Sequence, residues 1–399
     1  MFDVGLLPLL TEQAGVIEPA PLKIDHPIEL VQFSADDPKR EKILQSYLSK
    51  IQSAGFSKER QGLWMQAGDR LLEMNGGDDL HSGASLTKAA TTLAVLHRYD
   101  LNQRFQTKVS RTGSIENGVL QGDLIIEGGM DLLLMPAQAI AFGNLLEAQG
   151  IQKVAGNLVV IFPHQEALPE PEKLGTVLRE GMNAGLWSED TLRHYQQHLA
   201  QSPKPAVEIT GSIQPYSSPL SVPQEMMVHE SPTVLEMVKY MNLHSSNNLA
   251  EAFTADMGGM IVSRDTLLSV SGLPADEIQL QNGSGLGETN RMTPRAVVGI
   301  FMAIQNRLAS LNLDLKDAFP MSGTDIGTLE DRNIPKGAVV KTGTLWNVSA
   351  LAGYIPTEKE GRVWFAIMNE GGDYVDGFRK SQDVLLSQMV KHLAMNAAS

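Results

Sequence analysis

The chain of 399 residues contains no cysteine. This absence excludes disulfide bonds, thiolate catalysis and metal sites with cysteine ligands. The sequence also lacks any apolar run long enough to form a transmembrane helix. Basic residues are fewer than acidic ones, and the formal net charge of −14 at pH 7 argues against nucleic acid or an anionic membrane surface as a partner. Length and composition together indicate a globular protein with more than one domain.

The first ten residues do not resemble a typical signal peptide. They include Asp3, contain no Lys or Arg, and have only a short apolar run. If the protein is exported, two explanations stay open: a signal has been removed from the sequence, or export follows an unusual route.

Ser85-Leu86-Thr87-Lys88 is the only Ser-x-x-Lys sequence in the chain, and a helical pattern follows it from Leu86 to Leu101. Residues three positions apart share one face of an α-helix, so Lys88 is expected close enough to Ser85 to accept its proton. Backbone N–H groups at a helix start lack intrahelical partners and can face a developing oxyanion. Small and apolar neighbours should desolvate Lys88 and lower its pKa, which favours a neutral amine base. Taken alone, the pattern also fits a serine that caps a helix with an unrelated lysine.

Two further sequences add to this pattern. Ser246-Asn247-Asn248 lies within a helical stretch from Tyr240 to Met257, and Lys341-Thr342-Gly343-Thr344 follows the β-rich run Gly337–Val340. By itself the first is typical of helix capping, and the second of a strand that ends in a turn. Together and in this order, Ser-x-x-Lys, Ser-x-Asn and Lys-Thr-Gly are the motif set of β-lactamases and penicillin-binding proteins.

The chain resembles the D-Ala-D-Ala carboxypeptidase/endopeptidase family, the class C low-molecular-mass penicillin-binding proteins. The resemblance extends over roughly residues 60 to 390. Beyond the three motifs it is carried by Phe105-x-Thr107-x-Val109, Gly118-Val119-Leu120-x-Gly122-Asp123-Leu124, Gly128-Gly129, Gly150-Ile151, Gly156-Asn157-Leu158, Ser231-Pro232, Asn282-Gly283-Ser284-Gly285-Leu286, Thr293-Pro294, Gly327-Thr328-Leu329 and Ser349-Ala350-Leu351-x-Gly353-Tyr354.

The resemblance implies a serine-type D-alanyl-D-alanine carboxypeptidase, with D,D-endopeptidase activity as well. Ser85 would attack the carbonyl of the penultimate D-Ala of a peptidoglycan stem peptide, and Lys88 would accept the serine proton. Ser246 would pass a proton to the leaving amine, and Asn248 would orient Lys88 and the substrate. The family also implies a periplasmic location, β-lactams as covalent inhibitors, and no cofactor or metal.

The Lys-Thr-Gly strand would bind the substrate. Lys341 would supply positive charge for the terminal carboxylate, together with the hydroxyls of Thr342 and Thr344. Gly343 would let the strand lie close to the substrate, whose backbone could add to the sheet edge. The resemblance further implies an oxyanion hole made by the backbone N–H groups of Ser85 and Thr344.

We therefore predict an α+β fold of the β-lactamase/transpeptidase type, with an antiparallel sheet flanked by helices. The catalytic domain would comprise residues 1–105 and 223–399, and residues 106–222 would form an inserted, smaller α/β domain. The patterns predict a helix at Pro38–Ala54, a strand pair at Gly62–Gln66 and Arg70–Met74, three strands within Gly337–Asn369 and a closing helix at Val375–Met395.

Two other functions remain as alternatives. A β-lactamase would use the same motifs but release its acyl group rapidly, and the long insertion argues against it. A non-catalytic relative would bind wall peptides, and the intact motif set argues against that. The loop Asn282–Gly287 departs from the family, which has Asp and Ser at its first and last positions, so its detailed contacts are open.

Overall fold

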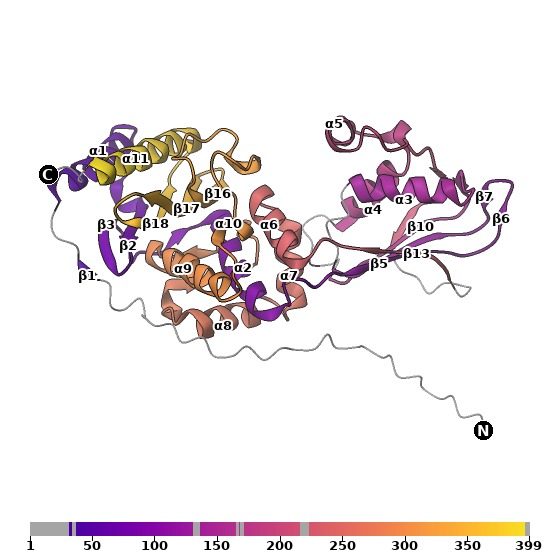
Figure 1. The fold of residues 1–399 in the computed structure, drawn as a ribbon, viewed down its shortest axis with the longest axis horizontal. Helices are drawn as coiled ribbons and strands as arrows, with labels where there is room; N and C mark the ends of the chain where they lie inside the picture. The colour runs from indigo at the N-terminus through magenta and orange to yellow at the C-terminus, as the bar shows by residue number, and fades with distance from the viewer. Residues whose placement is uncertain are drawn as a thin grey trace, which may run out of the picture.

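A six-stranded sheet forms the centre of the larger lobe of the molecule, on the left in Figure 1. The computed structural model describes residues 32–33, 37–130, 136–164, 167, 171–215 and 223–395. Neighbouring strands are antiparallel except at the edge, where the first two in the order run parallel. The order is β1 (Gln32–Phe33), β3 (Arg70–Asn75), β2 (Gln61–Ala67), β18 (Gly361–Glu370), β17 (Val348–Thr357) and β16 (Val339–Leu345).

The pairing of β2 with β18 joins the two ends of the chain in one sheet. The early strand pair and the late three strands therefore form one antiparallel sheet. Side chains of β18 alternate between two apolar layers, as the period of two in a strand requires: Phe365 packs on one face and Trp364 on the other. Because both faces are covered by helices, most side chains of the central strands are buried and apolar.

One face of the sheet is covered by α1 (Pro38–Ser53) and α11 (Val375–Met395), which lie side by side (Figure 1). Both helices match their predicted bounds within one residue. The other face packs against a larger group of helices, the first of which follows Ser85 in the chain. This group comprises α2 (Thr87–Arg98), α6 (Val234–His244), α7 (Asn247–Asp256), α8 (Met260–Ser271), α9 (Pro294–Ser310) and α10 (Leu315–Ala318).

The predicted helical stretch from Tyr240 to Met257 is two helices. The backbone of Ser245 adopts a left-handed conformation, with φ 56° and ψ 40°, and this ends α6. Ser246 then caps α7 by accepting a hydrogen bond from the Leu249 N–H. The resulting corner between α6 and α7 points two consecutive serines in different directions.

A three-stranded sheet contains the strand that precedes Ser85. Its order is β14 (Ile278–Gln279), β15 (Arg291–Met292) and β4 (His81–Ser82), all antiparallel. Since β4 ends three residues before Ser85, this sheet fixes where the following turn begins.

The inserted segment forms a separate five-stranded sheet with its own apolar core, and it extends away from the six-stranded sheet (Figure 1). β13 pairs with β5, so the inserted sheet includes residues up to Glu230. The insertion had been expected to end at residue 222. The five-stranded order is β12 (Ile213–Pro215), β10 (Leu158–Ile161), β8 (Leu124–Gly128), β5 (Gln106–Arg111) and β13 (Gln224–Glu230).

The remaining elements of the insertion are a small four-stranded sheet and three helices. The sheet contains β11 (Glu208–Ile209), β9 (Lys153–Val154), β7 (Val119–Leu120) and β6 (Ile115–Glu116). The helices are α3 (Pro136–Ala148), α4 (Pro171–Gly181) and α5 (Glu189–His198). Throughout the described part of the chain, no helix has the length and apolar character needed to cross a membrane.

Candidate active site

Ser85 lies in a short 3-10 turn, Ala84–Leu86, that runs directly into α2. The turn is strained, because Ala84 has φ 45°, a conformation that residues with a Cβ rarely adopt. Strain of this kind is retained where the surrounding structure holds a functional group in place. The first turn of α2 then brings Lys88 back to the serine, with Nζ 2.9 Å from Ser85 Oγ. The predicted pair is therefore together in the structure.

Lys88 is fully buried, and its ammonium group has two further partners. Nζ lies 2.8 Å from Asn247 Oδ1 and 2.6 Å from the carbonyl oxygen of Ser284. Burial lowers the pKa of Lys88 from 10.5 to about 7, and the nearby charge of Glu251 opposes this shift. At neutral pH a large fraction of Lys88 is thus uncharged and able to accept a proton.

Glu251 is a site residue that the sequence analysis missed. Its carboxylate accepts hydrogen bonds from the backbone N–H groups of Ser284, at 2.9 Å, and Gly283, at 3.2 Å. It thereby holds the loop whose Ser284 carbonyl contacts Lys88. The signal was available, because Glu251 lies one helical turn after Asn247 and shares its face of α7.

The second motif lies one residue earlier than expected. Asn247, and not Asn248, contacts Lys88, and Ser245, and not Ser246, accepts a hydrogen bond from Lys341 Nζ at 3.1 Å. The sequence contains two overlapping Ser-x-Asn patterns, and the corner between α6 and α7 selects the first. Consecutive residues of a helix are rotated by about 100°, so Asn247 and Asn248 cannot face the same partner.

Lys341 on β16 is also fully buried. In addition to Ser245, its ammonium group donates to the carbonyl oxygen of Thr342 at 2.8 Å. Burial holds the pKa of Lys341 well below its usual value of 10.5, and the charge of Lys88 adds to this effect. Ser245 therefore lies beside one lysine of a pair whose charges repel each other.

Gly343 brings β16 against the turn Gly83–Leu86, which is called the nucleophile turn after its predicted nucleophile, Ser85. A Cβ atom at this position would lie 2.2 Å from the carbonyl oxygen of Gly83 and 3.2 Å from the backbone nitrogen of Ser85. Only glycine fits such an approach between two backbones. The sequence analysis expected this glycine to admit the substrate, whereas the contact that the structure shows is with the segment carrying Ser85.

A cavity of about 350 Å³ opens at Ser85. Ser245, Thr342 and Thr344 line it, so the predicted nucleophile and the predicted binding strand share one space. Arg379 from α11 also lines it, and its Nη2 donates to Thr344 Oγ1 at 3.0 Å. A peptide in this cavity would meet hydroxyl groups, including that of Ser85, and both acidic and basic side chains.

The glycine-rich loop, Asn282–Gly287, packs against the nucleophile turn. Gly285 has φ 78°, and a Cβ there would lie 1.9 Å from the carbonyl oxygen of Ala84. Asn282, where the family has Asp, accepts hydrogen bonds from the Gly285 N–H at 2.8 Å and from Asn290 Nδ2 at 2.7 Å. Through these two hydrogen bonds the Asn282 side chain stabilises the conformation of the loop.

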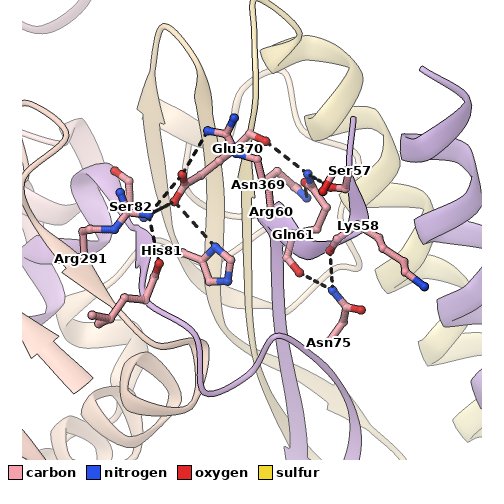
Figure 2. A network of polar contacts seen from close by, with 11 residues as sticks. Ser57, Lys58, Arg60, Gln61, Asn75, His81, Ser82, Arg291, Asn369 and Glu370 are labelled. Carbon is pink, nitrogen blue, oxygen red and sulfur yellow. Dashed lines mark hydrogen bonds and ion pairs between the residues drawn. The ribbon is translucent and has the colours of Figure 1, made fainter. Parts of the chain in front are cut away.

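A buried carboxylate holds the strand that precedes the nucleophile (Figure 2). Glu370 accepts a hydrogen bond from the Ser82 N–H at 2.5 Å and another from Arg291 Nη2 at 3.1 Å. Arg60 and His81 lie 3.7 Å from the same carboxylate. Because Ser82 belongs to β4, this network fixes the backbone three residues before Ser85, and no local pattern in the sequence pointed to it.

Comparison with known proteins gives a consistent result. The model of the D-Ala-D-Ala carboxypeptidase 3 (S13) family matches residues 56–170 and 178–393. The D-alanyl-D-alanine carboxypeptidase DacB of Haemophilus influenzae is 22% identical over 81% of this chain and 87% of its own length. Its solved structure, penicillin binding protein 4, has a TM-score of 0.60 and covers 86% of this chain and 98% of that one.

Two further proteins are similar. Penicillin-sensitive carboxypeptidase A of Dictyostelium discoideum is 27% identical over 35% of this chain, and the match spans only 30% of that protein's length. The penicillin-G-acylated predatory endopeptidase Bd3459 of Bdellovibrio bacteriovorus has a TM-score of 0.67 at 19% identity, covering 84% of this chain and 92% of that one. At this level of identity the structural matches establish the shared α+β fold.

Proposed function

The chain belongs to the D-Ala-D-Ala carboxypeptidase 3 (S13) family, and we propose that it is a serine-type D-alanyl-D-alanine carboxypeptidase that also cleaves D,D-crosslinks between peptidoglycan stem peptides. One observation carries the proposal. Ser85 Oγ lies 2.9 Å from a buried lysine whose pKa is lowered to about 7, at the wall of a cavity lined by Thr342 and Thr344. This is the arrangement that an acyl-transfer nucleophile and its base require.

Acylation begins with attack by Ser85 Oγ on the carbonyl carbon of the penultimate D-Ala. Neutral Lys88 accepts the serine proton as the bond forms, a contribution of about 10²- to 10⁴-fold in rate. Asn247 and the Ser284 carbonyl hold Nζ in position for this transfer. The developing oxyanion lies between the backbone N–H groups of Ser85 and Thr344, and loss of one such donor costs on the order of 10²- to 10³-fold.

The leaving amine needs a proton as the tetrahedral intermediate collapses. Ser245 is the group placed for this step, because its hydroxyl lies 3.1 Å from Lys341 Nζ and lines the cavity. It gives its proton to the amine and takes one from Lys341. Water then hydrolyses the serine ester. Its proton passes through Ser245 to Lys341, and Lys88 returns its proton to Ser85 as the ester bond breaks, so that all four side chains are restored.

β-Lactams should acylate the same serine and leave slowly, and the protein should act on peptidoglycan in the periplasm. The first statement is supported by the acylated structure of a protein with this fold, and the second by family membership alone.

Incubation with a fluorescent penicillin tests the proposal. We expect a stable covalent adduct that is absent from the Ser85→Ala variant. Rapid turnover without accumulation would instead indicate a β-lactamase, and absence of any adduct would indicate a non-catalytic binder. Labelling of the Ser85→Ala variant at another serine would contradict the assignment of the nucleophile.

Chromatography of digested sacculi tests the choice of substrate. The carboxypeptidase reaction removes pentapeptides, and the endopeptidase reaction removes crosslinked dimers. We expect both to be lost. Dimers that persist while pentapeptides disappear would restrict the function to carboxypeptidase activity.

A further inference from the structure

A substrate that ends in D-Ala carries a carboxylate into a cavity whose wall includes two acidic residues, Glu330 and Asp331. These charges repel an anion unless a cation lies beside it. The sequence analysis assigned that cation to Lys341. The structure gives Lys341 a fully buried side chain whose ammonium group already donates to Ser245 and to the Thr342 carbonyl.

Two arginines line the cavity as well. Arg332 has a side chain that is only 4% exposed, and its guanidinium group pairs with Asp383 at 2.7 Å, so its charge is neutralised inside the protein. Arg379 differs. Its side chain is 36% exposed, its partner Asp376 is 3.5 Å away and itself 85% exposed, and Nη2 donates to Thr344 Oγ1.

We propose that Arg379 is a substrate-positioning residue that binds the terminal carboxylate of the peptide together with the hydroxyl of Thr344. The inference rests on the proposed function, since it takes a peptide ending in D-Ala as the occupant of the cavity. A guanidinium group is charged at every physiological pH and carries five N–H donors, more than the two contacts of Arg379 use. Its planar fork matches a carboxylate in geometry as well as charge.

The proposal also assigns proton transfer and carboxylate binding to two different cations. Lys341, whose pKa is held well below the usual value, is suited to exchange a proton with Ser245. Arg379 cannot exchange protons and is suited to hold a charge that does not change during the reaction. Carboxylate binding and proton transfer therefore belong to different side chains on different elements, α11 and β16.

The test compares a D-Ala-D-Ala peptide with the same peptide ending in an amide. Binding is measured by NMR titration of the full chain carrying Ser85→Ala, so that nothing is cleaved. We expect the carboxylate form to bind roughly 10- to 100-fold more tightly, as a charge-assisted hydrogen bond allows. Arg379→Gln should remove this preference by weakening the carboxylate form alone, and Arg379→Lys should retain part of it.

Lys380→Ala is the matched control, because it removes one positive charge from the next residue of the same helix and Lys380 is exposed outside the cavity. It should leave the preference unchanged. An Arg379→Gln protein that still prefers the carboxylate would overturn the proposal, as would an equal loss in Lys380→Ala. Arg379→Gln that weakens acid and amide equally would mean a merely structural role, which also overturns it.

The two proposals fail in different ways. Failure of the proposed function would be seen in the unmodified protein, as no penicillin adduct and no released D-Ala. The binding measurement does not depend on turnover. It therefore tests whether Arg379 binds the carboxylate whatever the outcome of the activity assay.

Discussion

Acylation of Ser85 by a β-lactam should accelerate with rising pH along the titration of Lys88. The protonated amine cannot accept the serine proton, so the rate follows the neutral fraction of this side chain. Burial lowers the pKa of Lys88 to about 7. The acylation rate is therefore expected to rise around pH 7, and not around pH 10.5 as for a lysine in water.

The size of the step follows from that value. With a pKa of about 7, roughly 1% of Lys88 is neutral at pH 5 and about half at pH 7. The rate should rise about 50-fold between these two pH values and at most about twofold from pH 7 to pH 9. An unshifted lysine would instead give a tenfold rise for every pH unit up to pH 9.

The assay is the second-order rate constant for labelling by a fluorescent penicillin between pH 5 and pH 9, with circular dichroism to check that the fold persists. Lys341 also has a lowered pKa, so a variant must assign the step. The charge of Glu251 raises the pKa of Lys88, and Glu251→Gln should therefore move the midpoint to lower pH. Lys88→Arg should acylate several orders of magnitude more slowly throughout.

Three results would refute this reasoning. The first is a rate that does not change between pH 5 and pH 9, and the second is a tenfold rise per unit that continues to pH 9. The third is near-normal acylation by Lys88→Arg, which would make Lys88 only a structural cation.

Four other expectations follow from contacts around the site. Asn247→Ala should slow acylation roughly 10- to 100-fold through the loss of a charge-assisted hydrogen bond to Lys88, whereas Asn248→Ala should stay within about threefold of the unmodified rate; the reverse order would restore the motif frame first predicted. Ser246→Ala removes a helix cap and should lower the free energy of unfolding by about 1 kcal/mol without slowing acylation, which urea denaturation and penicillin labelling together would check. Gly343→Ala places a Cβ 2.2 Å from a backbone oxygen and should destabilise the protein by about 1–3 kcal/mol and slow acylation more than tenfold; unchanged kinetics would mean that the nucleophile turn does not depend on this strand. Glu370→Gln should lower the free energy of unfolding by about 1.5–3 kcal/mol through the lost ionic contact with Arg291, measured by urea denaturation, and an unaltered midpoint would show the network to be dispensable.

Patterns that depend on neighbouring residues were predicted well. The bounds of α1 and α11 could be predicted from their helical sequence patterns, and the β2–β3 pair from two strand-like segments around the turn at Gly68-Asp69. Ser85 and Lys88 could be paired from sequence because a helix fixes the geometry of residues three apart.

Predictions failed where two local patterns competed or where the partner was distant. Ser245 and Ser246 both begin a Ser-x-Asn pattern, and only the left-handed backbone at Ser245 decides which hydroxyl reaches Lys341. The insertion was expected to end at residue 222 because nothing local shows that β13 pairs with β5 more than a hundred residues earlier.

The sequence by itself determined the chemical groups of the site, the order of the motifs along the chain and the elements that carry them, because these depend on residue type and on spacing within one helix or strand. Tertiary structure alone decided how far the pKa of Lys88 is lowered, the choice of Asn247 and Ser245, and the presence of Arg379 at the cavity. Desolvation and contacts between distant segments arise only when the sheet and its helices close around the cavity, so no spacing in the chain could have revealed them.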